Sequence, residues 1–176
     1  MNQTQVDCVV VRRACGPDAD GLAAMLAGLS DLALYFRFQA AVGRPPRPGL
    51  IDHLLQPAGA SYVAERGPVI VGHAMWAWAN GSSSPTAELA VVIDESEQRR
   101  GLGVLLISRA AADAYAAGAT EFLMVVSAAN EKVIRMIRRH WPAAQVERDG
   151  ALLNYLVPAA APWSSSDLTA PAVVLV

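Results

Sequence analysis

The sequence predicts an α/β domain in which a central mixed, twisted sheet of about six or seven strands is flanked by helices. Residues 122–127, FLMVVS, are a continuous apolar run, which is typical of a strand covered on both faces. Residues 87–117 read as a strand, a glycine-containing turn and a helix, so with 122–127 they form a β–α–β unit whose two strands are parallel. Residues 61–79 and 146–157 read as hairpins, which add antiparallel strands.

Composition restricts the class of protein. At 176 residues the chain fits one domain that is large enough to bury a core. Hydrophobic residues make up 53% and charged residues 17%, which excludes general disorder. The net charge of −2 provides no basic field for nucleic acid, and no uninterrupted apolar stretch reaches the roughly 18 residues of a membrane span. We therefore expect neither nucleic-acid nor membrane partners.

Cysteine and histidine usage indicates a metal-free protein of a reducing compartment. Cys8 and Cys15 are the only two cysteines, fewer than a secreted disulfide framework usually has, and no signal peptide precedes them. A cytoplasmic location is the expectation. His53, His73 and His140 are scattered without paired ligand spacing, so no metal site is expected. His73 lies in an apolar strand and is expected to be a core residue.

The N-terminal part of the chain predicts one strand and several short helices. Proline and glycine interrupt it most strongly at GRPPRPG, residues 43–49, which we expect to be a loop beside the substrate cleft; the alternative is a plain solvated connection. In order, the predicted segments are a strand at 6–13, a helix from Asp18 or Asp20 through Gly28 or Leu29, a short helix that starts at Ser30 or Asp31, the loop at 43–49, and a short helix at 50–55.

The rest of the chain predicts the sheet and its two longer helices. On the strand at 87–93 alternation places Glu88, Ala90 and Val92 on one face. On the helix at 102–117 Arg109 and Asp113, four residues apart, are expected on the exposed side. The predicted segments are strands at 61–66 and 68–79, a strand at 87–93, a helix at 102–117, a strand at 122–127, a helix opened by Asn130 and ended by Pro142, and a hairpin at 146–148 and 151–157. The predicted domain covers 1–158, and 159–176 is expected to be a tail that is mobile unless its apolar end docks.

Residues 98–103, QRRGLG, lie between a strand and a helix, where backbone N–H groups and the helix dipole favour a phosphate. A dinucleotide fingerprint would need a third glycine, but position 106 is Leu106. A phosphate loop of the G-x-x-x-x-G-K-[ST] type needs Lys-Ser or Lys-Thr, and neither pair occurs in the chain. Both readings are therefore disfavoured.

A third pattern, Q/R-x-x-G-x-G/A, fits Gln98, Gly101 and Gly103 fully. It is the pyrophosphate loop of the GCN5-related N-acetyltransferases, and the predicted order of elements over about 6–158 resembles that family's order. The segment SAANEKVIRMIRRHW, which opens a helix at Asn130, resembles the family's second acyl-CoA motif. LSDLALYFRF, AELA at 87–90 and AANEKVIRMI resemble more closely a bacterial branch that modifies protein lysines and related amines.

The resemblance implies the splayed-strand fold of that family and acetyl-CoA, or another acyl-CoA, as co-substrate. Backbone N–H groups of the loop and the start of the following helix would hold the pyrophosphate, with two arginines adding charge. The preceding strand would pair with the pantetheine amides and place a backbone N–H near the thioester oxygen. The implied cofactor-binding residues are Val91, Val92, Ile93, Gln98, Arg99, Arg100, Gly101, Leu102, Gly103, Val104 and Asn130.

Glu88 is the candidate general base, because an ammonium acceptor must lose a proton before it attacks a thioester. It lies on an otherwise apolar strand face, and the branch resemblance implies the same role. The alternative is a polar strand-end residue paired with an arginine. Many family members place a tyrosine acid where this chain has Ile137, and Trp141-Pro142 replaces the usual Gly-Phe. Water or a distant residue would then supply the proton, or the thiolate would leave without one.

These features predict an acyltransferase that moves an acetyl group to a primary amine, on a small molecule or a protein lysine. The missing tyrosine keeps a second hypothesis open, a non-catalytic acyl-CoA-binding regulatory module. A nucleotide-binding α/β domain is a third, which the absent third glycine disfavours. The sequence identifies neither the acceptor nor the acyl chain, and it fits a monomer or a homodimer.

Overall fold

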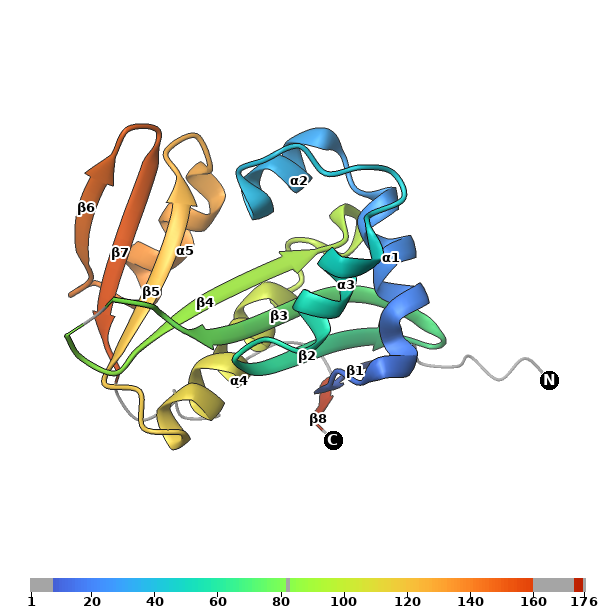
Figure 1. The fold of residues 1–176 in the computed structure, drawn as a ribbon, viewed down its shortest axis with the longest axis horizontal. Coiled ribbons are helices and arrows are strands. Elements are labelled where there is room, and N and C mark those ends of the chain that lie inside the picture. Colours follow the sequence, from blue (N-terminus) through green and yellow to red (C-terminus); the bar gives the residue numbers. More distant parts are fainter. Residues whose placement is uncertain (1–7, 82, 160–172, 176) are drawn as a thin grey trace.

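The computed structural model describes residues 8–81, 83–159 and 173–175, which form one twisted sheet with helices on both faces (Figure 1). The strands lie in the order β6-β7-β5-β4-β3-β2-β1-β8. Their bounds are β1 Val9–Arg13, β2 Gly59–Arg66, β3 Val69–Trp78, β4 Thr86–Ile93, β5 Glu121–Ser127, β6 Gln145–Asp149, β7 Leu152–Pro158 and β8 Val173–Leu175.

The sheet is mixed, as predicted. β4 pairs with β5 in parallel and β1 pairs with β8 in parallel, whereas the remaining neighbours are antiparallel. The β–α–β unit and both hairpins therefore form as the sequence indicates, and the predicted fold class is confirmed. The segment 173–175 adds an edge strand beside β1. The predicted tail otherwise lies outside the described residues, and the proposed domain limit at residue 158 stays a prediction.

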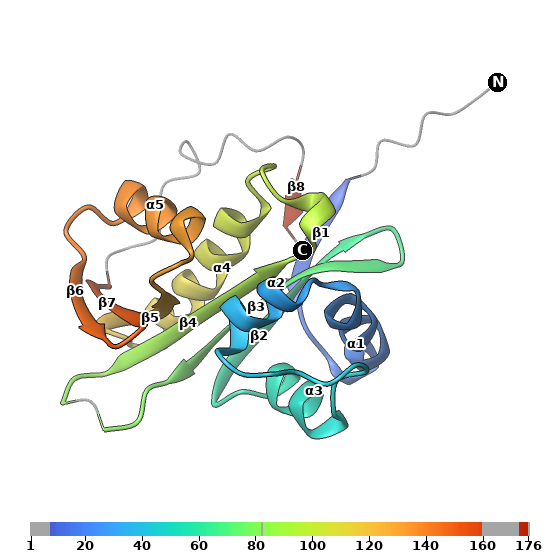
Figure 2. The same ribbon diagram turned by 90° about the horizontal axis from the view of Figure 1, so that it is seen from above.

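The helices form two layers, with α1, α2 and α3 on one side of the sheet and α4 and α5 on the other (Figure 2). Their bounds are α1 Ala19–Gly28, α2 Asp31–Phe38, α3 Pro48–Leu55, α4 Leu102–Ala116 and α5 Glu131–His140, with 3-10 turns at Gly16–Asp18 and Glu95–Glu97. α3 begins inside the segment predicted as loop, because proline is favourable in the first helical turn, where its missing N–H costs nothing.

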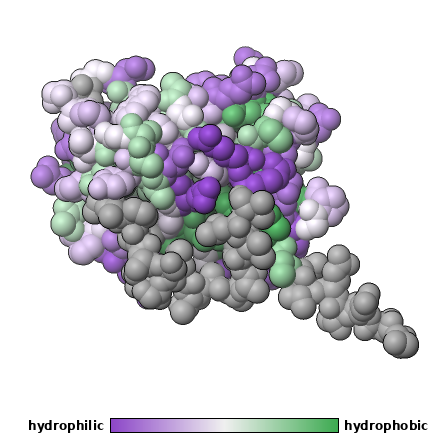
Figure 3. Space-filling model, turned by 90° about the horizontal axis from the view of Figure 1, so that it is seen from below, coloured by the Kyte–Doolittle hydropathy of each residue, from purple (hydrophilic) through white to green (hydrophobic). Residues whose placement is uncertain are grey.

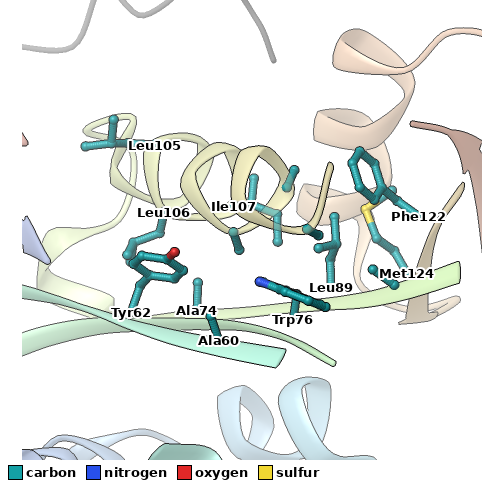
Figure 4. Close-up of a cluster of buried hydrophobic side chains, with 14 of the residues drawn as sticks. Ala60, Tyr62, Ala74, Trp76, Leu89, Leu105, Leu106, Ile107, Phe122 and Met124 are labelled. Carbon is teal, nitrogen blue, oxygen red and sulfur yellow. The ribbon is translucent and has the colours of Figure 1, made fainter. Parts of the chain in front are cut away.

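The larger core lies between α4 and the sheet (Figure 4). Leu106 and Ile107 of α4 face Tyr62 and Trp76 of the strands, and all four are at least nine-tenths buried. Seen from below, the described part of the surface mixes hydrophilic and hydrophobic residues (Figure 3). Apolar burial is thus concentrated between helix and sheet, which fixes the start of α4 against the end of β4.

The prediction of an exposed side of α4 is correct for Arg109, which is exposed, and wrong for Asp113. Asp113 is half-buried and accepts a hydrogen bond from the indole N–H of Trp76 at 2.8 Å, with Arg13 3.2 Å away. Arg109 lies over the ring of Tyr62, 5.6 Å from its centroid. These side chains therefore contact the sheet, because the strands beneath α4 supply partners that a helix-only argument does not include.

A second core lies under the other helical layer and contains Leu22, Leu26 and Leu54. His73 of β3 is fully buried beside it, with its Nε2 2.9 Å from Ser61 Oγ and 3.2 Å from the Leu54 carbonyl oxygen. The prediction of a core histidine is confirmed. Burial, and to a smaller extent the charge of Arg37, lower the pKa of His73 to about 3, so the imidazole is neutral.

No single helix within the described ranges is long and apolar enough to cross a membrane. Two consecutive helical segments, Gly16–Gly28 and Asp31–Phe38, are together long and apolar enough, but the chain bends by 118° between them. Over the same residues no group of three or more His, Cys, Asp or Glu side chains is arranged to hold a metal ion.

Candidate functional site

The neighbouring parallel strands β4 and β5 separate after a short stretch of pairing. Only 86–88 of β4 pair with 121–123 of β5 (Figure 1). Hydrogen bonds to β3 alternate along β4, and they involve the even-numbered residues, because Ala79 N–H donates to Thr86 O and Asp94 N–H donates to Val71 O. The N–H groups of Val91 and Ile93 therefore point away from β3, into the opening.

A cavity of about 360 Å³ lies at this opening. β4 crosses it with residues 88–91, so Glu88 faces into the cavity while remaining exposed to solvent. One wall comes from α2, α3 and β3, and the opposite wall from β5 and α5. The cavity thus connects the two helical layers through the gap in the sheet, and it can hold two reactants that approach from opposite sides.

The loop that precedes α4 has the backbone expected of an anion site. Arg99 has φ 66° and Gly101 has φ 79°, so the chain turns sharply just before the helix. No side chain caps α4, and the N–H groups of its first turn have no acceptor within the helix. A Cβ added at Gly103 would contact only Ile93, at 3.6 Å, so this turn is open above the glycine. A phosphate group would satisfy these donors.

The loop is anchored by a buried carboxylate that the sequence did not single out. Glu97 is 8% exposed and accepts two hydrogen bonds from Arg66, at 3.0 and 2.7 Å, which hold the loop to β2. Arg100 contacts the same carboxylate at 3.3 Å from a largely exposed position. Arg99 is exposed at the turn. Arg99 and Arg100, predicted to bind phosphate, are thus both exposed at the loop, and Arg100 forms an ion pair with Glu97.

Gln98 links the loop to both sides of the opening. Its side-chain amide donates to the carbonyl oxygen of Ile93 at 3.4 Å, and its oxygen accepts from Lys132 of α5 at 3.4 Å. The glutamine of the motif therefore fixes the end of β4 relative to α5. This role is structural within the protein and is compatible with a ligand above the glycines.

Asn130 caps α5, as its oxygen accepts a hydrogen bond from the Val133 N–H at 3.3 Å. Its side chain also lines the cavity. Ile137, two turns further along, is fully buried and lines the same wall. Ile137 occupies the position at which many family members have a tyrosine acid, so the cavity wall is apolar there.

Val92 differs from the other predicted residues of β4. Its backbone bonds toward β3, by the alternation described above, and its side chain is buried in the core under α1 and α3. Val91 and Ile93 offer N–H groups to the opening, and Val92 does not. Contact between Val92 and a ligand therefore stays a prediction without geometric support.

Sequence reasoning missed Arg37 of α2. Its side chain is half-buried in the cavity wall, its Nε is closed off from solvent, and burial lowers its pKa to about 10, opposed in part by the charge of Glu88. The residue still carries its charge at neutral pH. Nothing in the periodicity of LALYFRFQA separates this arginine from one on a solvated helix face.

Comparison with known protein families assigns the chain to one of them. Residues 29–141 match the model of the acetyltransferase (GNAT) family, which is more than half of the chain. No curated protein sequence matches the chain.

Solved structures are similar in fold. The GNAT domain of PAT from S. lividans superposes with a TM-score of 0.72 at 21% identity, over 84% of this chain and 89% of that one. An N-acetyltransferase from Staphylococcus aureus Mu50 gives 0.66 at 18% identity, over 86% and 99%. Structurally similar too is yncA from Salmonella typhimurium with its cofactor acetyl-CoA, with 0.65 at 16% identity, over 90% and 96%. At these identities the likeness shows the fold.

Proposed function

This chain belongs to the acetyltransferase (GNAT) family, and we propose that it transfers an acetyl group from acetyl-CoA to a primary amine, on a protein lysine or a small molecule. The observation that carries the proposal is the opening between β4 and β5, where backbone N–H groups that do not bond to β3 and an acidic side chain meet at one cavity, while the uncapped start of α4 follows shortly after the end of β4. No metal takes part in the proposed reaction.

In this proposal the groups around the opening hold acetyl-CoA. The pyrophosphate lies on the N–H groups from Arg99 to Val104, and Arg100 turns from Glu97 to a phosphate while Arg66 keeps the carboxylate paired. The pantetheine arm takes the place of a missing strand segment beside β4, with its amides facing Val91 and Ile93. Asn130 lies beside this arm on the opposite wall.

The acceptor approaches from the side of α2 and α3. Glu88 takes a proton from the ammonium group, and the neutral amine nitrogen then attacks the thioester carbonyl carbon. A backbone N–H of β4 stabilises the oxyanion of the tetrahedral intermediate. The attacking nitrogen gives up its second proton to water, collapse of the intermediate breaks the carbon–sulfur bond, and the coenzyme leaves as thiolate or takes a proton from water, because Ile137 offers none.

The apolar side chain of Ile137 also supports a second candidate, a module that binds acyl-CoA and regulates a partner without catalysis. The acceptor class within the enzyme hypothesis rests on the similarity of LSDLALYFRF and AANEKVIRMI to the bacterial protein-lysine branch. Both hypotheses require the same acyl-CoA site, so the site is tested first.

Calorimetric titration with acetyl-CoA tests the site directly. We expect micromolar binding by the protein and loss of binding in Gly103→Trp, which fills the open space above the first turn of α4. Gly49→Trp is the matched control, since Gly49 is exposed in α3 with open space around it, on the opposite side of the sheet from α4 (Figure 2). No binding by the unmodified protein at millimolar acetyl-CoA would overturn both hypotheses.

A further inference from the structure

The cavity wall formed by α2 contains a cation that the protein itself does not pair. Arg37 lies in the last turn of α2, and among the described residues its buried Nε has no hydrogen-bond partner and its guanidinium forms no ion pair within 4 Å. The nearest favourable contact is the ring of Phe38, whose centroid lies 4.8 Å from the guanidinium carbon. A charged side chain whose Nε–H is buried without an acceptor is costly to the folded protein.

The surroundings identify what would satisfy this arginine. Glu88 acts on it electrostatically from β4, and His73 is neutral in its buried position, so it adds no charge to the cavity. Apart from the polar side chains of Gln39 and His53, the rest of this side of the cavity is apolar and includes Phe36, Leu50 and Met75. A guanidinium presents a planar pair of donors that matches a carboxylate. The wall therefore offers the positive group of Arg37, the negative group of Glu88 and a mainly apolar surface between them.

We propose that the acceptor is an amine that also carries a carboxylate and an apolar side chain, such as an apolar α-amino acid, with Arg37 binding the carboxylate and Glu88 binding the amine. The assignment rests on the proposed acetyl transfer. A protein lysine brings a cation for Glu88 but no anion for Arg37, whereas the zwitterion of an amino acid matches both charges of the cavity.

The same arrangement explains how the acceptor nitrogen is oriented. A carboxylate held at α2 and an ammonium group at β4 fix the acceptor at two points, which limits its rotation relative to the thioester. The apolar side chain then lies against Phe36 and Met75, away from the opening toward α5. Arg37 is thus a specificity-determining residue that contacts the acceptor.

Paired acceptors test the assignment. Release of the coenzyme thiol is measured with L-methionine and with 3-(methylthio)propylamine, which is the same molecule without its carboxylate, and likewise with L-leucine and 3-methylbutylamine. We expect kcat/KM to be about 100-fold higher for each amino acid, because a site built for a polar group rejects the analogue that lacks it. A lysine-containing peptide with blocked ends serves as the third acceptor.

Variants of Arg37 separate recognition from folding. Arg37→Met keeps the length of the side chain and removes the buried charge, so it should fold, bind acetyl-CoA normally and lose the preference for the carboxylate, with little change for the plain amines. Arg37→Lys should retain part of the preference. Thermal-shift measurements with L-methionine on the protein saturated with coenzyme A provide a readout that needs no turnover, and the shift should vanish in Arg37→Met.

Three results would overturn the assignment: equal kcat/KM for each amino acid and its amine, preference for the lysine peptide, or an unchanged carboxylate preference in Arg37→Met. Absence of carboxylate-dependent turnover and of a methionine-dependent thermal shift overturns it as well. All of these leave acetyl-CoA binding intact. Failure of the proposed function is distinct, because it shows either as loss of acetyl-CoA binding in the titration or as absence of turnover with every amine, including the plain amines and the lysine peptide.

Discussion

Glu88 is the residue on which the proposed chemistry depends most. Glu88→Gln keeps the shape of the side chain and removes its ability to take a proton, so we expect kcat to fall by about 10²–10³-fold. The Kd for acetyl-CoA should stay within about twofold, because Glu88 lies on the acceptor side of the opening. Steady-state kinetics and calorimetry on the same preparation check both values. Wild-type kcat in the variant would assign Glu88 a structural role.

Tyr155 of β7 contains a polar group without a visible function. It is 3% exposed, and its hydroxyl has no hydrogen-bond partner among the described residues. Replacing an unsatisfied buried hydroxyl with hydrogen removes a desolvation cost, so Tyr155→Phe should raise the free energy of unfolding by about 1 kcal/mol. Urea denaturation measures this change.

The same variant also tests whether Tyr155 replaces the missing tyrosine at position 137. If Tyr155 supplied a proton to the leaving thiolate, Tyr155→Phe would lower kcat. We expect kcat to be unchanged, and Tyr62→Phe is the comparison. Tyr62 is equally buried, but its hydroxyl meets arginine side chains, so its removal should destabilise the protein.

At the residue level the sequence predicts chemistry best where local geometry determines it. Gly101 lies in the left-handed region and Asn130 caps its helix, both at positions that a linear motif specifies. Arg37 and Glu97 were missed because their significance comes from segments far away in the chain. The alternation of β4 distinguishes Val91 and Ile93, whose N–H groups point into the opening, from Val92, whose backbone bonds toward β3.

Secondary-structure elements, like single residues, were predicted best where the local sequence pattern determines them. Strands with continuous or alternating apolar patterns, such as β4 and β5, appear within one residue of their predicted bounds. The start of α3 was misplaced because a proline-rich segment looks like a loop until Pro48 is recognised as a first-turn residue. The partners of Asp113 could not be predicted, because β1 and β3 supply them.

Close packing between β2 and β3 gives an element-scale prediction. A Cβ added at Gly59 would lie 2.3 Å from the carbonyl oxygen of Trp76, a backbone atom that cannot move freely. Gly59→Ala should therefore lower the free energy of unfolding by about 1–3 kcal/mol. Gly49→Ala is the control, because Gly49 lies in α3 with open space around it and should gain up to about 1 kcal/mol. Equal urea midpoints for the two variants would contradict the packing argument.

For the whole molecule, two buried titratable groups predict loss of stability in acid. His73 has a pKa of about 3 in the fold against an ordinary 6.5, so below pH 6.5 the unfolded chain binds a proton that the folded chain does not. The free energy of unfolding then falls by about 1.4 kcal/mol per pH unit until pH 3. Hydrogen bonding to Arg12 lowers the pKa of Asp18 from 3.8 to about 2. The contribution of Asp18 to the free energy of unfolding is therefore lost only as the pH falls from about 3.8 to about 2.

Urea midpoints between pH 7 and pH 5 measure the contribution of the histidine alone. His73→Gln keeps a side chain that can hydrogen-bond Ser61 and cannot titrate. The unmodified protein should lose about 2 kcal/mol more than the variant between pH 6.5 and pH 5. Parallel pH dependences would show that His73 is protonated in the folded state.

The parting of β4 from β5 also determines how fast individual backbone hydrogens exchange with solvent. The N–H groups of Val91 and Ile93 lie in the middle of a sheet, yet no neighbouring strand accepts from them. In heavy water they should exchange within seconds, whereas Val92, bonded toward β3, should exchange only on opening of the sheet. Acetyl-CoA should slow Val91 and Ile93 and leave Val92 unchanged, which residue-resolved exchange by NMR would reveal. Rapid exchange at the centre of an otherwise protected sheet would then mark a place where the ligand completes the fold.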